Sequence, residues 1–196
     1  MKRWALLCGA MLLFAGIASA QDDSKVTVFG GYSYVRANPG FGAPGLNFNG
    51  GSGSIAYNVN SWLGAVADFG GYHWSGSGDT SGVDATVVTY LFGPKVSMHA
   101  GPITPFVQTL FGGAHGSGDI TGVVCDARVR SVRPEQSLCS GSGSDNAFSM
   151  ALGGGLDWNA TPHIGVRLIQ GEYLMTRFFS NTQNNARISA GVTFRF

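Results

Sequence analysis

The sequence Ala-Arg-Ile-Ser-Ala-Gly-Val-Thr-Phe-Arg-Phe, residues 186–196, alternates apolar and polar side chains. A period of two predicts a β-strand with one apolar and one polar face. Two architectures are consistent with such a strand. A soluble sandwich buries the apolar face against a second sheet, whereas a barrel in lipid turns it outward and directs the polar face to a lumen. The apolar positions are Ile188, Ala190, Val192, Phe194 and Phe196, and the polar ones are Arg187, Ser189, Thr193 and Arg195.

Residues 1–20 have the three parts of a secretory signal peptide. Lys2 and Arg3 form the basic start, residues 4–17 the apolar run, and residues 18–20 the small-residue cleavage site Ala-Ser-Ala. We expect export and cleavage, which leave residues 21–196 as a single barrel domain.

The composition of residues 21–196 limits the classes of protein. Without Lys2 and Arg3, ten basic residues face eleven acidic ones, and this balance gives no reason to expect a nucleic-acid partner. No further apolar run approaches the roughly 18 residues of a membrane helix, so a membrane protein of this sequence spans with strands. Glycine, at 31 residues, exceeds its usual share of about 7%. Doublets inside predicted strands, such as Gly70-Gly71, permit sharp bends or close neighbours.

Eight amphipathic runs predict eight strands, and their connections alternate in length. The connections 58–61, 97–102 and 159–162 are short, whereas 36–45, 76–83, 115–145 and 178–185 are longer and polar or glycine-rich. Such alternation with an even number of strands is typical of bacterial outer-membrane barrels, and Greek-key sandwiches have no reason to sort their loops this way. We therefore predict an all-β, eight-stranded antiparallel up-and-down transmembrane β-barrel. Its strands are expected at 24–36, 46–59, 62–75, 84–97, 103–114, 146–159, 163–177 and 186–196.

Charged residues within the strands fall on the side opposite the apolar residues. The interior of an eight-stranded barrel is just wide enough for side chains to fill, and buried charges there require partners. The pattern indicates a salt-bridged plug, and a narrow or gated water pathway is the alternative. The predicted lumen charges are Asp68, Lys95, Asp157, Arg167, Glu172, Arg187 and Arg195. Aromatic residues near strand ends predict interfacial girdles: Tyr34, Tyr57, Trp62, Trp74, Trp158, Phe194 and Phe196.

Two stretches leave the facing of side chains open. In 103–114 both parities carry apolar residues. In 168–173 the parity changes, because Arg167 places odd positions inward while Gln170 and Glu172 are polar at even positions. Either a β-bulge repairs the parity or Glu172 already lies above the membrane.

The long loop 115–145 contains two cysteines and a basic cluster. We expect a disulfide between Cys125 and Cys139, because the exported chain is in an oxidising compartment and the crosslink stabilises by about 3 kcal/mol. Arg128, Arg130 and Arg133 lie between them. This basic loop either contacts anionic lipopolysaccharide or a partner's surface by charge attraction, or is a solvated loop crosslinked against proteolysis.

One pair of residues suggests an enzyme. His73 and Ser75 share the outward parity near the outer rim, where the histidine is placed to act as general base to the serine. The pair resembles that of outer-membrane lipid A deacylases, with Asp84 as a guess for the orienting acid, but it lies on the third predicted strand and not near the C-terminus. We therefore predict no catalytic residues, no metal site and no cofactor.

The sequence also resembles a known family. The segments 166–173, Val-Arg-Leu-Ile-Gln-Gly-Glu-Tyr, and 192–196, Val-Thr-Phe-Arg-Phe, are similar to the small outer-membrane β-barrels related to the barrel domain of outer-membrane protein A. The resemblance implies the bacterial outer membrane, contact with its lipid and lipopolysaccharide, and insertion by the barrel assembly machinery. It also implies an assembly signal at Phe194 and Phe196. The peptidoglycan-binding domain of larger relatives is not found, so cell-wall anchoring is not expected.

These observations predict a non-enzymatic outer-membrane barrel with a structural or surface-interaction role through its long extracellular loops. A narrow transport pore is the first alternative, and a lipid A-modifying enzyme is the second. The sequence does not identify an extracellular partner.

Overall fold

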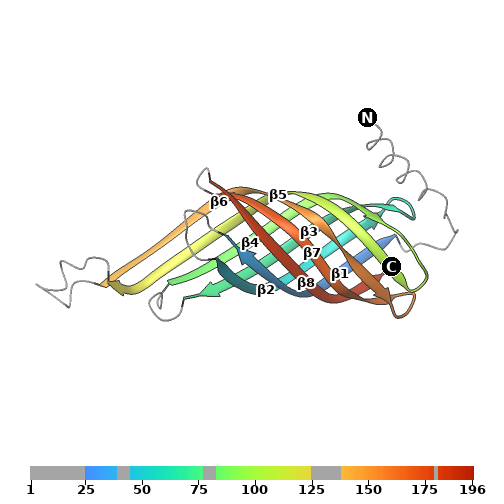
Figure 1. The fold of residues 1–196 in the computed structure, drawn as a ribbon, viewed down its shortest axis with the longest axis horizontal. Coiled ribbons are helices and arrows are strands. Elements are labelled where there is room, and N and C mark those ends of the chain that lie inside the picture. The colour runs from blue at the N-terminus through green and yellow to red at the C-terminus, as the bar shows by residue number, and fades with distance from the viewer. Residues whose placement is uncertain (1–24, 39–44, 77–82, 125–137, 179–180) are drawn as a thin grey trace, which may run out of the picture.

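A computed structural model describes residues 25–38, 45–76, 83–124, 138–178 and 181–196. Their strands pair in sequence order, and the last strand closes on the first to form a barrel (Figure 1). All neighbouring strands are antiparallel, which confirms the predicted up-and-down barrel in place of the sandwich. The strands are β1 Val26–Ala37, β2 Leu46–Asn58, β3 Leu63–Ser75, β4 Val83–Ser97, β5 Ile103–Val124, β6 Leu138–Asn159, β7 Ile164–Phe178 and β8 Asn181–Arg195.

The C-terminal stretch closes the barrel by pairing with β1 on one side and β7 on the other. At its end, the Val26 N–H donates to the Phe196 carbonyl at 3.0 Å, and the Phe196 N–H donates back at 2.9 Å. Side chains alternate along β8: Ile188 is 49% exposed on the outer surface, whereas Arg187 is 1% exposed in the lumen. The predicted apolar face is therefore the outer face.

Tight turns gather at the end of the barrel where Phe196 lies. In one turn the Asn60 side-chain oxygen accepts from the Leu63 N–H at 2.7 Å. In another, Gly101 adopts a φ of 63°, which favours glycine, at the first of the two residues between Ala100 and Ile103. Short turns face the periplasm in bacterial outer-membrane barrels, so we name this end periplasmic and the opposite one outer.

β5 and β6 continue past their predicted ends. Each has 22 residues, against 12 to 15 in the other strands. Their pairing runs to Val124 and Leu138, so the predicted loop 115–145 is wrong over much of its length. β8 likewise begins at Asn181 instead of at 186. Beyond the membrane neither face needs to be apolar, so the alternation disappears while the backbone pairing continues.

β7 contains the change of parity that the sequence indicates. Arg167 and Gln170 both face the lumen, whereas Leu168 and Ile169 between them are 50% and 52% exposed on the outer surface. The register with β8 shifts between Arg167 and Gln170, which identifies a β-bulge. The predicted bulge is therefore confirmed, and it returns Glu172 to the lumen face, where the side chain is buried.

The outer surface of the barrel carries many large apolar side chains, whose exposure suits a lipid environment. In β5, where the sequence leaves the facing open, Phe106 and Leu110 point inward and Val107 and Phe111 point outward. Trp74 does not belong to a girdle as predicted, because it packs against the buried apolar cluster inside the barrel. The described part of the chain has no helix that is long and apolar enough to cross a membrane.

Candidate functional site in the lumen

Arg187 of β8 is the centre of a buried ion-pair cluster. Its Nη1 lies 2.7 Å from Oδ1 of Asp68 on β3, and its Nε donates to Oε2 of Glu172 on β7 at 2.6 Å. Nη2 lies 2.5 Å from the same Glu172 oxygen, at an angle that does not suit a hydrogen bond. A single guanidinium therefore ties β3 to β7 and β8 across the lumen.

Two neutral side chains complete this cluster. Tyr72 accepts a hydrogen bond from Nη1 of Arg187 at 3.0 Å, and Gln108 donates to Oε1 of Glu172 at 2.8 Å. Buried carboxylates are tolerated when hydrogen bonds satisfy their oxygens. With two carboxylates and one guanidinium, the cluster carries a formal charge of −1.

A second ion pair lies nearer the periplasmic end. Arg167 of β7 binds Asp157 of β6 in a bidentate manner, with Nε to Oδ1 at 2.7 Å and Nη2 to Oδ2 at 3.1 Å. Its Nη1 donates to Gln170 at 2.7 Å. Such a paired fork combines charge with fixed geometry, so it holds β6 and β7 together on the inner face.

Aromatic rings surround the cations at this level. The Arg167 guanidinium carbon lies 4.3 Å from the centre of the Phe29 ring and 4.4 Å from that of Phe106, and Lys95 Nζ lies 4.2 Å from the centre of Phe106. Cation–π contact of this kind stabilises buried cations. A Cβ on Gly155 would come within 2.7 Å of the Phe106 ring, so the glycine provides room for the aromatic side chain.

The structure thus brings six of the seven predicted lumen charges into the interior, each at most 5% exposed. Arg195 differs, because it is only partly buried and donates from Nη2 to the Thr161 carbonyl at 3.1 Å at the periplasmic mouth. Four further lumen residues of this site were not predicted from the sequence. Phe29 has the parity of Ser33 in β1, and Tyr72 has the parity of Asp68 in β3. This shared parity with a polar residue could have predicted that both aromatic side chains face the lumen. Phe106 and Gln108 lie in the stretch 103–114, where apolar residues at both parities gave no prediction of which side chains face the lumen.

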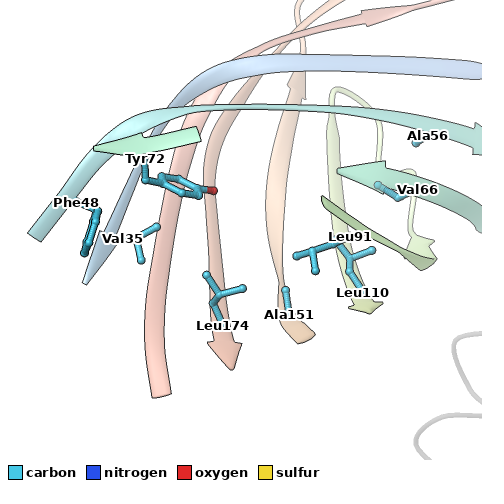
Figure 2. Packing of buried hydrophobic residues seen from close by; sticks show 9 residues of the cluster. All are labelled: Val35, Phe48, Ala56, Val66, Tyr72, Leu91, Leu110, Ala151 and Leu174. Atoms are coloured by element: carbon cyan, nitrogen blue, oxygen red, sulfur yellow. The ribbon is translucent and has the colours of Figure 1, made fainter. Parts of the chain in front are cut away.

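Apolar side chains fill much of the remaining interior. Figure 2 shows this cluster, in which Val35, Phe48 and Leu174 come from the outer part of their strands and Ala56 and Val66 lie apart from them. The other members are Tyr72, Leu91, Leu110 and Ala151. Charged and apolar side chains together occupy a lumen that is only wide enough for side chains.

The residues of the hypothetical enzyme site lie on the outer surface. His73 contacts Ser75 through Nε2 at 2.9 Å and Thr86 through Nδ1 at 3.1 Å, and Asp84 lies 3.9 Å from Nε2. In a catalytic triad the serine and the acid engage opposite ring nitrogens. Here both lie at Nε2, and a threonine hydroxyl occupies the nitrogen that the acid requires. The arrangement does not support a triad.

Several predicted residues are not tested by this geometry. Cys125 and the three arginines Arg128, Arg130 and Arg133 lie outside the described residues, as does the side chain of Cys139 in β6. The disulfide and the basic cluster therefore remain predictions. Phe194 and Phe196 are exposed on the outer surface, and their role in assembly remains a prediction as well. Within the described ranges, no group of three or more histidines, cysteines and carboxylates is arranged to hold a metal ion.

A closed antiparallel barrel with an apolar outer surface and a lumen filled by side chains, ion pairs among them, defines the class of small outer-membrane β-barrels. The sequence matches the family described as outer membrane protein beta-barrel domain over residues 5–196, and the chain belongs to this family. This membership places the protein in the bacterial outer membrane.

Solved structures share the fold at low sequence identity. Ail, the attachment invasion locus protein of Yersinia pestis, is 18% identical, with a TM-score of 0.58 over 88% of this chain and 99% of that chain. Neisserial surface protein A is 13% identical, with a TM-score of 0.64 over 90% of this chain and 100% of that chain. A search of curated proteins found no match.

Proposed function

We propose that this protein is a non-enzymatic outer-membrane barrel that acts by surface interaction at its outer end. The β5–β6 hairpin, which projects beyond the other strands in Figure 1, is the observation that carries this proposal. In the described chain β6 pairs with β7 only from Phe148, so residues 138–147 have β5 as their one neighbouring strand. A ribbon outside the barrel adds nothing to the lumen, and exposed segments held by a rigid scaffold often carry function.

The packing of the lumen supports a structural interior over a transport pathway. The ion-pair cluster is buried, with Arg187, Asp68 and Glu172 each at most 5% exposed. On its periplasmic side, the rings of Phe29 and Phe106 flank Arg167. Opening a water pathway through these layers requires separation of buried ion pairs, which is costly. The barrel thus serves as a scaffold for the hairpin.

The partner that we propose is an anionic saccharide of the cell surface or of a host. The connection between β5 and β6 contains Arg128, Arg130 and Arg133, which attract sulfate, phosphate and carboxylate groups. Ail, whose fold is similar, has been solved in complex with the heparin analogue sucrose octasulfate. Lipopolysaccharide and sulfated glycans present the same chemistry, and binding assays with each distinguish them.

The proposal includes the steps that bring the barrel to the surface. Residues 1–20 direct export and are removed, and Phe196 with Phe194 forms the signal read by the barrel assembly machinery. The Cys125–Cys139 disulfide closes the end of the hairpin and limits its proteolysis.

The test is binding of intact cells to immobilised heparin and, separately, to lipopolysaccharide. We expect the triple variant R128Q/R130Q/R133Q to bind at least one of them roughly tenfold more weakly, because charge contacts of up to about 1 kcal/mol each are lost. Arg177→Gln is the matched control, because Arg177 is exposed at the outer end of β7. Equal binding by the triple variant and the unaltered protein, with both correctly folded, refutes the proposed contact.

Two further measurements decide between the proposal and its alternatives. If the unaltered protein produces stable single-channel conductance in planar bilayers, the barrel is a pore. Mass spectrometry of lipid A from cells that express the unaltered protein or His73→Ala tests the enzyme, and identical lipid A ends that hypothesis.

A further inference from the structure

The periplasmic mouth of the barrel contains a cavity of about 30 Å³. Every residue that lines it is polar or charged, and the lining comes from six strands and the turns between them. A polar cavity of this size holds water or a small ion, whereas a dry cavity requires apolar walls. The cavity lies on the lumen side of the strands and not on the lipid-facing surface.

The charges around this cavity do not balance. Asp157 is the one carboxylate in the lining, and Arg167 occupies both of its oxygens. Lys95 and Arg195 also line the cavity. Among the residues that the structure describes, neither has a carboxylate within ion-pair distance. Three cations therefore share one carboxylate at this end of the lumen.

Lys95 is the residue for which this imbalance matters most. It is 5% exposed, and its ammonium group contacts the Phe106 ring. Two cations, Arg167 and Arg195, lie within electrostatic reach of it, against the single carboxylate of Asp157, which Arg167 already pairs. Burial of an ammonium group without a carboxylate at ion-pair distance is costly, and an aromatic ring offsets only part of that cost. Arg195 adds a buried Nε that has no hydrogen-bond partner. An anion in the cavity would neutralise Lys95 and accept a hydrogen bond from Nε of Arg195.

Hydroxyl groups of the lining add donors suited to oxygen ligands. Thr104 accepts a hydrogen bond from Asn159 Nδ2 at 2.9 Å, which leaves its own hydroxyl proton available for a ligand. Thr27 likewise accepts from Asn58 at 3.4 Å. A cavity that combines an ammonium group, a guanidinium N–H and hydroxyl donors matches a small oxyanion.

We propose that the periplasmic mouth binds a small free oxyanion, of the phosphate or carboxylate class, between Lys95 and Arg195. The site is independent of the outer hairpin and lies at the opposite end of the barrel. The volume excludes larger ligands, and the layer formed by Arg167, Phe29 and Phe106 separates the site from the outer half of the lumen.

The test uses the full barrel folded in an uncharged, phosphate-free detergent, with inorganic phosphate as the probe. Thermal unfolding is followed by the gel shift between folded and unfolded forms, with sodium chloride adjusted to constant ionic strength. A ligand that binds only the folded state raises the midpoint with its concentration. We expect this rise for the unaltered protein, and a phosphate dissociation constant at least tenfold weaker for Lys95→Met and for Arg195→Gln.

Lys25→Gln is the matched control, because Lys25 is an exposed lysine at the same end of the barrel and does not line the cavity. It should keep the full phosphate response. Lys95→Met should also unfold at a higher temperature than the unaltered protein without phosphate, because an unpaired buried charge is removed. Calorimetric titration of the unaltered protein with phosphate keeps the test independent of variants that fail to fold. The absence of a heat signal in that titration, or an equal phosphate response in Lys95→Met, overturns the proposal.

Discussion

Replacement of Arg187 by methionine is the most informative test of how the lumen stabilises this barrel. The substitution removes the cation that, among the described residues, contacts both Asp68 and Glu172, whose side chains are 1% and 0% exposed. The carboxylates of Asp68 and Glu172 then remain in the lumen, and among the described residues Gln108 is the side chain that still donates a hydrogen bond to Glu172. The barrel must either keep two unpaired negative charges or bind protons to neutralise them.

The expected loss follows from the burial of the pair. Removal of one partner from a buried ion pair costs about 3–5 kcal/mol, because the remaining charge has lost its solvent and its partner. With a urea dependence of about 2 kcal/mol per molar, the unfolding midpoint should fall by roughly 2 M. The compensated variant R187M/D68N/E172Q has no unpaired charge, so it should recover most of the lost stability.

Urea unfolding in phospholipid vesicles, followed by tryptophan fluorescence and by the gel shift, measures these midpoints. Arg177→Gln, which removes an exposed arginine from β7, provides the control and should leave the midpoint unchanged. The reasoning is refuted if Arg187→Met unfolds at the same urea concentration as the unaltered protein. It is also refuted if the compensated variant is no more stable than the single one.

Two further predictions concern the backbone of the barrel. A Cβ on Gly50 would meet the carbonyl oxygen of Gly71 on the neighbouring strand, so Gly50→Ala should cost about 1–3 kcal/mol in the same urea assay. Gly71→Ala, whose Cβ would meet nothing within 4 Å, should change stability by less than about 0.5 kcal/mol, and equal effects would contradict this account. Deletion of Leu168 removes one of the two consecutive outward residues and forces Glu172 out of the lumen. We expect no folded band on the gel, whereas Leu168→Val should fold, and a folded deletion variant would show that the bulge is dispensable.

The facing of most side chains followed from the sequence because it is a local property. In β3, β4 and β6 one parity is apolar and the other carries Asp68, Lys95 or Asp157, so the chemistry of each strand identifies its lipid face without reference to its neighbours. The parity change near Arg167 was equally visible. The sequence could not show whether a bulge or an exit from the membrane causes this change, because the answer depended on Arg187 of β8 lying opposite Glu172.

The lengths of β5 and β6 show where local reasoning fails. Residues 115–124 and 138–145 are rich in glycine, serine and polar residues, a composition typical of loops. They nevertheless form a ladder, because strand pairing is made by backbone groups that each strand presents to the other. Outside the membrane both faces of the ribbon meet water, so no alternation marks it in the sequence.

The architecture, the lipid-facing surface and the identity of the lumen charges could be predicted from the residues, since these depend on a period of two and on the lengths of the connections. The partners of those charges required the folded barrel: Arg187 pairs with Asp68 and Glu172, and Arg167 pairs with Asp157. The tertiary structure alone revealed that Lys95 and Arg195 share a polar cavity without a carboxylate of their own. The physical reason is that barrel closure and strand register set the distances across the lumen, and neither is encoded within a single strand.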